Sequence, residues 1–190
     1  NIAGNANIIT RIGGNYVDAK ASAGSFATYE GQVSAGYETG KFSQNYLVAY
    51  RESGGYRNHA DLDRLSLAGK WFYYFSDKTR LGLIARHYTS NAQEPGYLTF
   101  ADSRANRRMT NAYNATDGDV RKLQQFSAHF DAGITDYFDV IAKAYVNRTR
   151  DDRFVKFSAG AAQQRRLTNE DHMGALAAPH YHASIGGMDV

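Results

Sequence analysis

The sequence contains no cysteine, only two prolines and no apolar run long enough for a membrane helix. Without cysteine, a disulfide framework and thiol chemistry are excluded. A membrane helix needs about 20 consecutive, mostly apolar residues, whereas the longest aromatic run is Trp71-Phe72-Tyr73-Tyr74-Phe75. If the chain meets a membrane, only a closed β-barrel can satisfy its backbone hydrogen bonds there.

Charge and catalytic motifs are equally sparse. The net charge is +3, and the basic residues are scattered rather than clustered, so no nucleic-acid partner is expected. Neither a nucleophile elbow nor a glycine-rich phosphate cradle is present. We therefore expect no catalytic residues, no cofactor and no enzyme activity.

What the chain does have is 14 tyrosines, 18 glycines and an aromatic content of 13%. Many tyrosines and glycines with few long aliphatic residues suit strands whose two faces meet lipid and water. A soluble core of this size would hold more leucine and isoleucine.

The clearest element is a hairpin over residues 64–90. Leu65, Leu67, Gly69, Trp71 and Tyr73 alternate with mostly polar residues. The turn 76–79 follows, and residues 80–90 run back. This period of two predicts one apolar and one mixed face. Further strands are expected at 16–23, 29–38, 42–56, 123–134 and 140–147, a weaker one at 166–178, and the start of another at 184–190.

Short and long connections alternate along the chain. Tight turns are expected at 38–41, 76–79 and 135–138, and longer loops at 55–63, 91–120 and 150–165, the last within a charged excursion, 148–165. Aromatic residues crowd the tight turns. Outer-membrane barrels show this asymmetry, with short periplasmic turns and an aromatic girdle. The fold expected is all-β, a partial antiparallel transmembrane β-barrel.

Three blocks, in this order and spacing, resemble TonB-dependent outer-membrane receptors. Asn7-Ile8-Ile9-Thr10-Arg11 looks like the end of their plug domain. Gly24-Ser25-Phe26, followed by Tyr29, is similar to their first barrel hairpin. Ser53-Gly54-Gly55-Tyr56-Arg57 is similar to the end of their third strand. Residues 150–154 and 186–189 fit more loosely.

The resemblance implies a plugged barrel of about 22 strands in the bacterial outer membrane. Residues 1–14 would be the last plug strand and linker, and 15–190 the N-terminal part of the barrel, about its first third. Such receptors import ferric siderophores or other small metal complexes, with energy from TonB through a plug region missing here. Outer-membrane lipid and lipopolysaccharide would be further partners. The alternatives are a small porin or adhesin barrel of about eight strands and a soluble all-β binding module.

Ligand contacts are expected in the long loop and at the upper strand ends. Arginines there would hold an anionic chelate, and aromatic rings would pack on a planar ligand. The alternatives are lipopolysaccharide phosphates as partners of these arginines, a solvated loop, or structural bonds to the barrel wall. The candidate residues are Tyr56, Arg57, Arg86, Tyr88, Tyr97, Phe100, Arg104, Arg107, Arg108 and Tyr113.

Three histidines raise the question of a metal. His180 and His182 would share one face of a strand, and His172, Met173 and Met188 lie near them in sequence. Imidazole with thioether suits copper. Two histidines without a fixed third ligand are also typical of ordinary polar positions, and no metal is expected.

Overall fold

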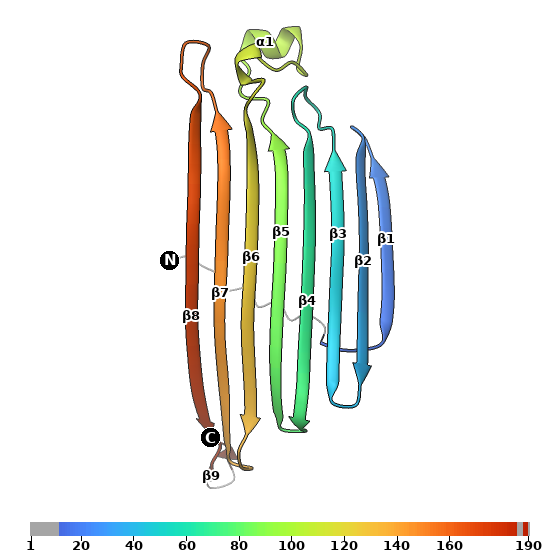
Figure 1. The fold of residues 1–190 in the computed structure, drawn as a ribbon, viewed down its shortest axis with the longest axis vertical. Helices are drawn as coiled ribbons and strands as arrows, with labels where there is room; N and C mark the ends of the chain where they lie inside the picture. The colour runs from blue at the N-terminus through green and yellow to red at the C-terminus, as the bar shows by residue number, and fades with distance from the viewer. Residues whose placement is uncertain (1–11, 186–187, 190) are drawn as a thin grey trace.

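The computed structural model describes residues 12–185 and 188–189 and consists almost entirely of one antiparallel sheet (Figure 1). Its eight strands are hydrogen-bonded in chain order, from β1 to β8. The strands are β1 (Tyr16–Gly24), β2 (Thr28–Thr39), β3 (Phe42–Ser53), β4 (Leu62–Ser76), β5 (Thr79–Gln93), β6 (Gly118–Gly133), β7 (Phe138–Val155) and β8 (Gln164–Tyr181).

Three smaller pieces of regular structure accompany the sheet. A short helix, α1 (Phe100–Ala105), and a 3-10 turn, η1 (Ala112–Asn114), lie in the loop between β5 and β6. β9 (Ser184–Ile185) and β10 (Met188–Asp189) pair only with each other. No described helix is long and apolar enough to cross a membrane.

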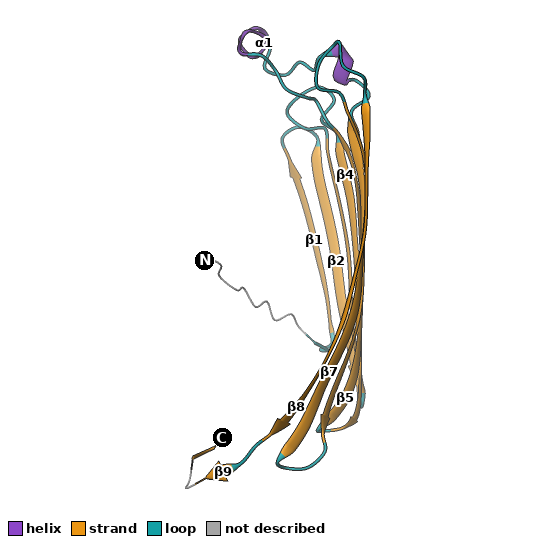
Figure 2. Ribbon diagram, turned by 90° about the vertical axis from the view of Figure 1, so that its left-hand side faces the viewer, coloured by secondary structure: helices purple, strands orange, loops and turns teal. Residues whose placement is uncertain are grey.

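The connections alternate as the sequence predicts. At one end of the sheet the tight turns 40–41, 77–78 and 134–137 join successive strands. At the other end lie the connections 25–27, 54–61, 94–117 and 156–163. Figure 1 shows the turns at the bottom and α1 with the loops at the top. In the side view the sheet is a single curved layer, and the long loop leans to one side (Figure 2).

The two faces of the sheet differ in chemistry. Residues opposite one another in an antiparallel register share a face. The register places Val33, Val48 and Leu67 in one row, and Trp71, Leu83 and Ala128 in another on the same face. We call this the apolar face, and the side that carries Lys70, Arg86 and Asp131 the polar face. The predicted common face of Leu65, Trp71, Tyr73, Phe130 and Val140 is confirmed.

No second layer covers the apolar face in the described part of the chain. On both faces together, the described residues include only three buried hydrophobic ones, Phe72, Ala132 and Val155. Val33 is 50% exposed and Leu83 is 49% exposed, both in the middle of strands. A water-soluble sandwich would bury such residues between two sheets. The hydrophobic effect therefore favours contact of this face with an apolar environment that the described residues do not supply.

The polar face has its own small packing cluster. The ring of Phe72, which is 4% exposed, lies over Gly82 on the next strand, where a Cβ atom would collide with it. Residues 12–15 also lie against this face, because the Gly13 amide donates to Asn45 Oδ1 at 2.7 Å and the Gly14 amide to Glu38 Oε2 at 2.7 Å.

Several sequence-based boundaries were wrong. The charged segment 148–165, with its loop at 150–165, is largely strand: β7 continues to Val155, β8 begins at Gln164, and the loop is only 156–163. Most of its charges are held in ion pairs, as Arg165 Nη2 and Asp152 Oδ2 are at 2.8 Å. These charged residues can therefore lie in strands instead of in a solvated loop. The predicted loop 91–120 is shorter, from 94 to 117.

The expected strand at 184–190 is the small β9–β10 pair instead of a new strand of the sheet. The predicted plug strand at 1–11 lies outside the described residues. Among those that are described, β1 and β8 are not paired with each other, so the sheet is not a closed eight-stranded barrel.

Candidate ligand-binding site

The long loop between β5 and β6 presents an exposed tip. Thr99 caps α1 through Oγ1, which accepts a hydrogen bond from the Asp102 amide at 3.1 Å, and Asp102 Oδ2 accepts from the Thr99 amide at 3.4 Å. This capping box fixes a helix of six residues. Tyr97 and Phe100 remain 82% and 76% exposed, and the Arg104 guanidinium lies 5.0 Å from the Phe100 ring centroid.

Arg57 anchors this loop from below. Its Nη1 donates to the Gly96 carbonyl at 2.5 Å, its Nη2 to the carbonyls of Pro95 and Met109 at 2.9 and 2.8 Å, and its Nε to Met109 again. A guanidinium offers five N–H donors, and Arg57 makes four hydrogen bonds to residues 95, 96 and 109 of one loop. Arg57 therefore holds the loop closed, and little of it is left for a ligand.

Arg108 joins three connections at the same end of the sheet. Its guanidinium carbon lies 5.9 Å from the ring centroids of both Phe26 and Tyr56, and its Nε donates to the Tyr56 carbonyl at 3.0 Å. The two rings meet edge to face at 5.5 Å. This aromatic and cationic cluster links the β1–β2 turn, the β3–β4 loop and the long loop.

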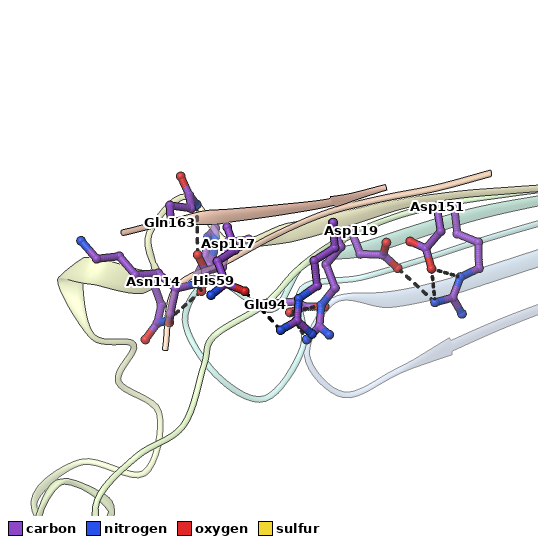
Figure 3. A network of polar contacts seen from close by, with 12 residues as sticks. His59, Glu94, Asn114, Asp117, Asp119, Asp151 and Gln163 are labelled. Atoms are coloured by element: carbon purple, nitrogen blue, oxygen red, sulfur yellow. Dashed lines mark hydrogen bonds and ion pairs between the residues drawn. The ribbon is translucent and has the colours of Figure 1, made fainter. Parts of the chain in front are cut away.

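A buried polar network forms the base of these loops (Figure 3). Asp117, 2% exposed, accepts hydrogen bonds at Oδ2 from the Lys156 amide at 2.9 Å and Asn114 Nδ2 at 2.7 Å. Its Oδ1 accepts from Gln163 Nε2 at 3.1 Å, and its carbonyl is 2.6 Å from His59 Nε2. Asp117 thus connects three loops, with its carboxylate bonded to residues of 156–163 and its carbonyl to His59 of 54–61. Sequence reasoning missed this residue.

Below that base, two carboxyl groups of neighbouring strands face each other on the polar side. Burial raises the pKa of Asp119 to about 6, and the adjacent Asp151, as hydrogen-bond partner and like charge, acts in the same direction. The Asp151 pKa is lowered by hydrogen bonds from Asp119 and Arg121. Arg121 Nη2 lies 2.8 Å from Asp151 Oδ2 and 3.7 Å from Asp119 Oδ2. Both residues lie near the loop end of their strands: Asp119 is the second residue of β6, and Asp151 lies four residues before the end of β7 at Val155.

Further down the polar face lies a hollow of about 420 Å³ that includes Arg86 and Tyr88. Arg86 Nη1 donates to Gln125 Oε1 at 3.0 Å. The hollow combines cationic, phenolic and apolar surface. Its polar-face side chains are Leu47, Ser66, Ala68, Arg86, Tyr88, Leu123, Gln125, Asn147 and Thr149.

The ten sequence-predicted contact residues thus fall into three groups. Tyr97, Phe100, Arg104 and Arg107 are exposed in the loop at its tip, and Arg86 and Tyr88 line the hollow. The remaining four take part in internal contacts: Tyr56, Arg57, Arg108 and Tyr113, whose hydroxyl accepts from Asn111 Nδ2 at 3.2 Å.

The histidines do not come together as a group of three. His180 Nδ1 and His182 Nε2 lie 2.8 and 2.6 Å from the two oxygens of Asp139. His172 is instead 3.3 Å from Glu170. In residues 12–185 and 188–189, no cluster of three or more His, Asp or Glu side chains is arranged to hold a metal ion.

No family model and no curated protein matches the sequence. Two solved structures are similar to it. The ferric-catecholate import receptor Fiu of E. coli K12, in its open form, aligns with a TM-score of 0.69 and 13% identity over 95% of this chain and 33% of its own. The siderophore receptor PiuA of Acinetobacter baumannii aligns with a TM-score of 0.77 and 12% identity over 93% of this chain and 29% of its own.

The chain therefore spans about a third of the length of these receptors. At this identity the likeness establishes the fold. The predicted all-β barrel architecture is confirmed in the form of an open eight-stranded section, and the resemblance to TonB-dependent receptors is confirmed at the level of the fold. The chain has the fold of part of the β-barrel of TonB-dependent siderophore receptors.

Proposed function

We propose that the chain is part of an outer-membrane receptor that binds a ferric siderophore or a similar small metal complex and imports it with energy from TonB. Residues 15–190 would form the N-terminal part of the barrel, and residues 1–14 the last plug strand and linker. Binding and gated release would need no bond chemistry in this section.

One observation carries the proposal. The sheet is a single layer with one apolar and one polar face, and it has tight turns at one end and mutually bonded loops at the other. That combination fits a wall between hydrocarbon and a water-filled interior. Fiu and PiuA, which share the fold, are receptors for ferric catecholates and siderophores by name.

The ligand would meet two surfaces in turn. The exposed tip, with Tyr97, Phe100, Arg104 and Arg107, offers aromatic faces and positive charge for an anionic, ring-bearing chelate. Arg86 and Tyr88 in the hollow would contact it further inside. Tyr56, Arg57, Arg108 and Tyr113 would shape the loop, with Tyr56 and Arg108 also reachable from outside.

The test uses the full-length protein in detergent with ferric enterobactin-type catecholate as the probe. Wild-type protein should bind the ferric chelate tightly and the iron-free catecholate more weakly. The triple variant Arg104→Gln/Arg107→Gln/Arg108→Gln should lose at least about tenfold in affinity, about 1.4 kcal/mol. A matched control is Lys20→Gln/Lys41→Gln/Lys143→Gln, which removes three charges away from the loop.

Two results would contradict the proposal. Unchanged affinity in the triple variant would remove the loop from the binding site. A monomer that stays folded without detergent would exclude the membrane barrel altogether, because its exposed apolar face would then have to be covered within the protein. Heat-modifiable migration on gels is expected for the wild type.

A further inference from the structure

Acids and arginines alternate at the loop end of β6 and β7, on the polar face. The register places Asp119 of β6 opposite Arg153 of β7. Two residues along the strands it places Arg121 opposite Asp151. Side chains opposite one another in an antiparallel pair are within reach of each other, since their Cβ atoms are about 5 Å apart. The register alone would therefore pair Asp119 with Arg153.

Glu94 of the long loop takes Arg153 instead. Arg153 Nε lies 2.8 Å from Glu94 Oε1, and its Nη2 lies 2.7 Å from Oε2. The cation left to Asp119 is Arg121, whose Nη2 is 3.7 Å from Asp119 Oδ2. The same nitrogen is only 2.8 Å from Asp151 Oδ2. Three carboxyl groups thus share two guanidinium groups, and Figure 3 shows Glu94, Asp119 and Asp151 in succession along this face.

A proton on Asp119 removes this excess of negative charge. Asp119 Oδ1 and Asp151 Oδ1 are buried and receive no donor from the other described residues. The two carboxyl groups are hydrogen-bonded to each other, which requires one of them to carry a proton. Burial, and then the hydrogen bond to Asp151, raise the pKa of Asp119 to about 6. Asp119 is therefore the carboxyl group that gains and loses the proton.

The other residues near Asp119 do not supply a positive charge in place of that proton. Asp117 directs its carboxylate to the Lys156 amide. The phenols of Tyr88 and Tyr97 lie near Arg121 and Arg153 and bring no positive charge. Each of the two arginines in the same two rows is separated from Asp119 by a whole strand. On β4, β5 and β8 these rows consist of Leu62, Arg64, Ser90, Ala92, Arg166 and Thr168.

We propose that Arg153 exchanges between Glu94 and Asp119 as Asp119 gains and loses a proton, and that this exchange ties or frees the start of the long loop. With Asp119 protonated, Arg153 binds Glu94 and holds the loop to β7. With Asp119 ionised, a second carboxylate competes for the guanidinium and Glu94 is released. The exchange needs only a rotation of the Arg153 side chain, because Asp119 is its direct neighbour across the strands.

The exchange regulates the proposed binding site. Glu94 begins the segment that carries Tyr97, Phe100 and Arg104 of the exposed tip. Mild acid holds this segment in place, whereas ionisation of Asp119 lets it open locally while the sheet stays folded. The regulation of ligand capture rests on the proposed function, but the exchange of Arg153 between its two partners does not.

The experiment measures amide hydrogen exchange of the full-length protein in detergent, at about pH 5 and about pH 8. Rates are converted to protection factors, which correct for the intrinsic pH dependence of exchange, and the amides of β2 and β3 serve as the internal reference. In the wild type, protection of residues 94–117 should fall at least about threefold from the lower to the higher pH, relative to β2 and β3. Asp119→Asn stays neutral and should keep the acid-state protection at both pH values. Glu94→Gln should show the weaker protection at both.

The matched control is Glu30→Gln, which removes a polar-face carboxylate that is paired with Arg51, away from the long loop. It should keep the wild-type pH dependence. Two results would overturn the inference: wild-type loop protection that is the same at both pH values, or an equal change in Asp119→Asn. Failure of the proposed function gives a different result, because the wild type would then bind no ferric chelate while the pH dependence of loop protection remained.

Discussion

Arg153 holds Glu94 with a two-pronged ion pair: its Nε lies 2.8 Å from Oε1 and its Nη2 2.7 Å from Oε2. Arg153 belongs to β7 and Glu94 is the first residue after β5, so the pair spans β6 and fixes the departure of the long loop. Paired geometry of this kind is the strongest form of a side-chain ion pair.

Replacing Glu94 by glutamine should loosen the loop without unfolding the sheet. The variant loses the charge and one of the paired acceptors, and the expected cost is about 1 kcal/mol because both side chains are partly exposed. Hydrogen exchange of the amides in 94–117 should accelerate several-fold, while exchange in β2 and β3 stays unchanged. Glu170→Gln, on exposed β8, is the control and should leave the loop protected.

The difference between an anchoring and a contacting arginine is testable at Arg57 and Arg104. Arg57→Ala leaves three loop carbonyls without their charged donor, at a cost of about 2 kcal/mol, so both ligand affinity and loop protection should fall. Arg104→Ala should lower affinity alone. The checks are ligand titration and hydrogen exchange on the same samples. A loss of affinity in Arg57→Ala with full loop protection would make Arg57 a direct contact.

Stability should decline with pH where the Asp119–Asp151 pair ionises. The Asp119 pKa is raised to about 6, so between roughly pH 4 and pH 6 the folded protein binds more protons than the unfolded chain. Stability from this carboxyl is therefore lost as pH rises through that window. Asp119→Asn should flatten the decline and be more stable than wild type above pH 6, by about 3 kcal/mol at most.

Urea unfolding in detergent at a series of pH values measures this effect. Asp151→Asn is the informative counterpart. Arg121 Nη2 donates a hydrogen bond to Asp151 Oδ2 at 2.8 Å, and the pKa of Asp151 is lowered. The Asp151→Asn variant should therefore be less stable than wild type above pH 4. Identical pH profiles for wild type and Asp119→Asn would show that Asp119 ionises as an ordinary surface carboxyl.

Adjacent residues on opposite faces should respond differently to the same charge. Leu83 is on the apolar face, and Ile84 is on the polar face opposite Lys70. Leu83→Asp should cost about 2 kcal/mol in a bilayer, because a charge facing hydrocarbon is destabilising. Ile84→Asp gains Lys70 as a partner and should cost less. Unfolding in lipid vesicles gives both values, and equal costs would argue that the apolar face does not meet hydrocarbon.

The strands and their faces could be predicted because they depend on alternation within one segment. The hairpin around the turn 76–79 needs only the period of two and a short polar turn, and both appear in the sequence. The same alternation placed Arg86 and Tyr88 on the polar face, where the structure has them at the hollow.

The rest depended on partners distant in sequence. Residues 150–153 resemble a loop when read alone, yet Asp152 is matched by Arg165 and Arg150 by Asp171 on the next strand. Asp117 gave no signal, because its partners Lys156 and Gln163 lie about 40 residues or more away. The Thr99-to-Asp102 spacing matches the sequence pattern of a capping box and is the local signal that indicates α1.

The simple strand order has a kinetic consequence. Every strand of the sheet pairs with its neighbours in the chain, so each new strand can add to the edge formed by the strand before it. The short turns 40–41 and 77–78 keep the loop-closure entropy lost in this step small. The sheet can grow hairpin by hairpin, and the slowest addition should be that of β6, which must first close the 24-residue connection formed by residues 94–117.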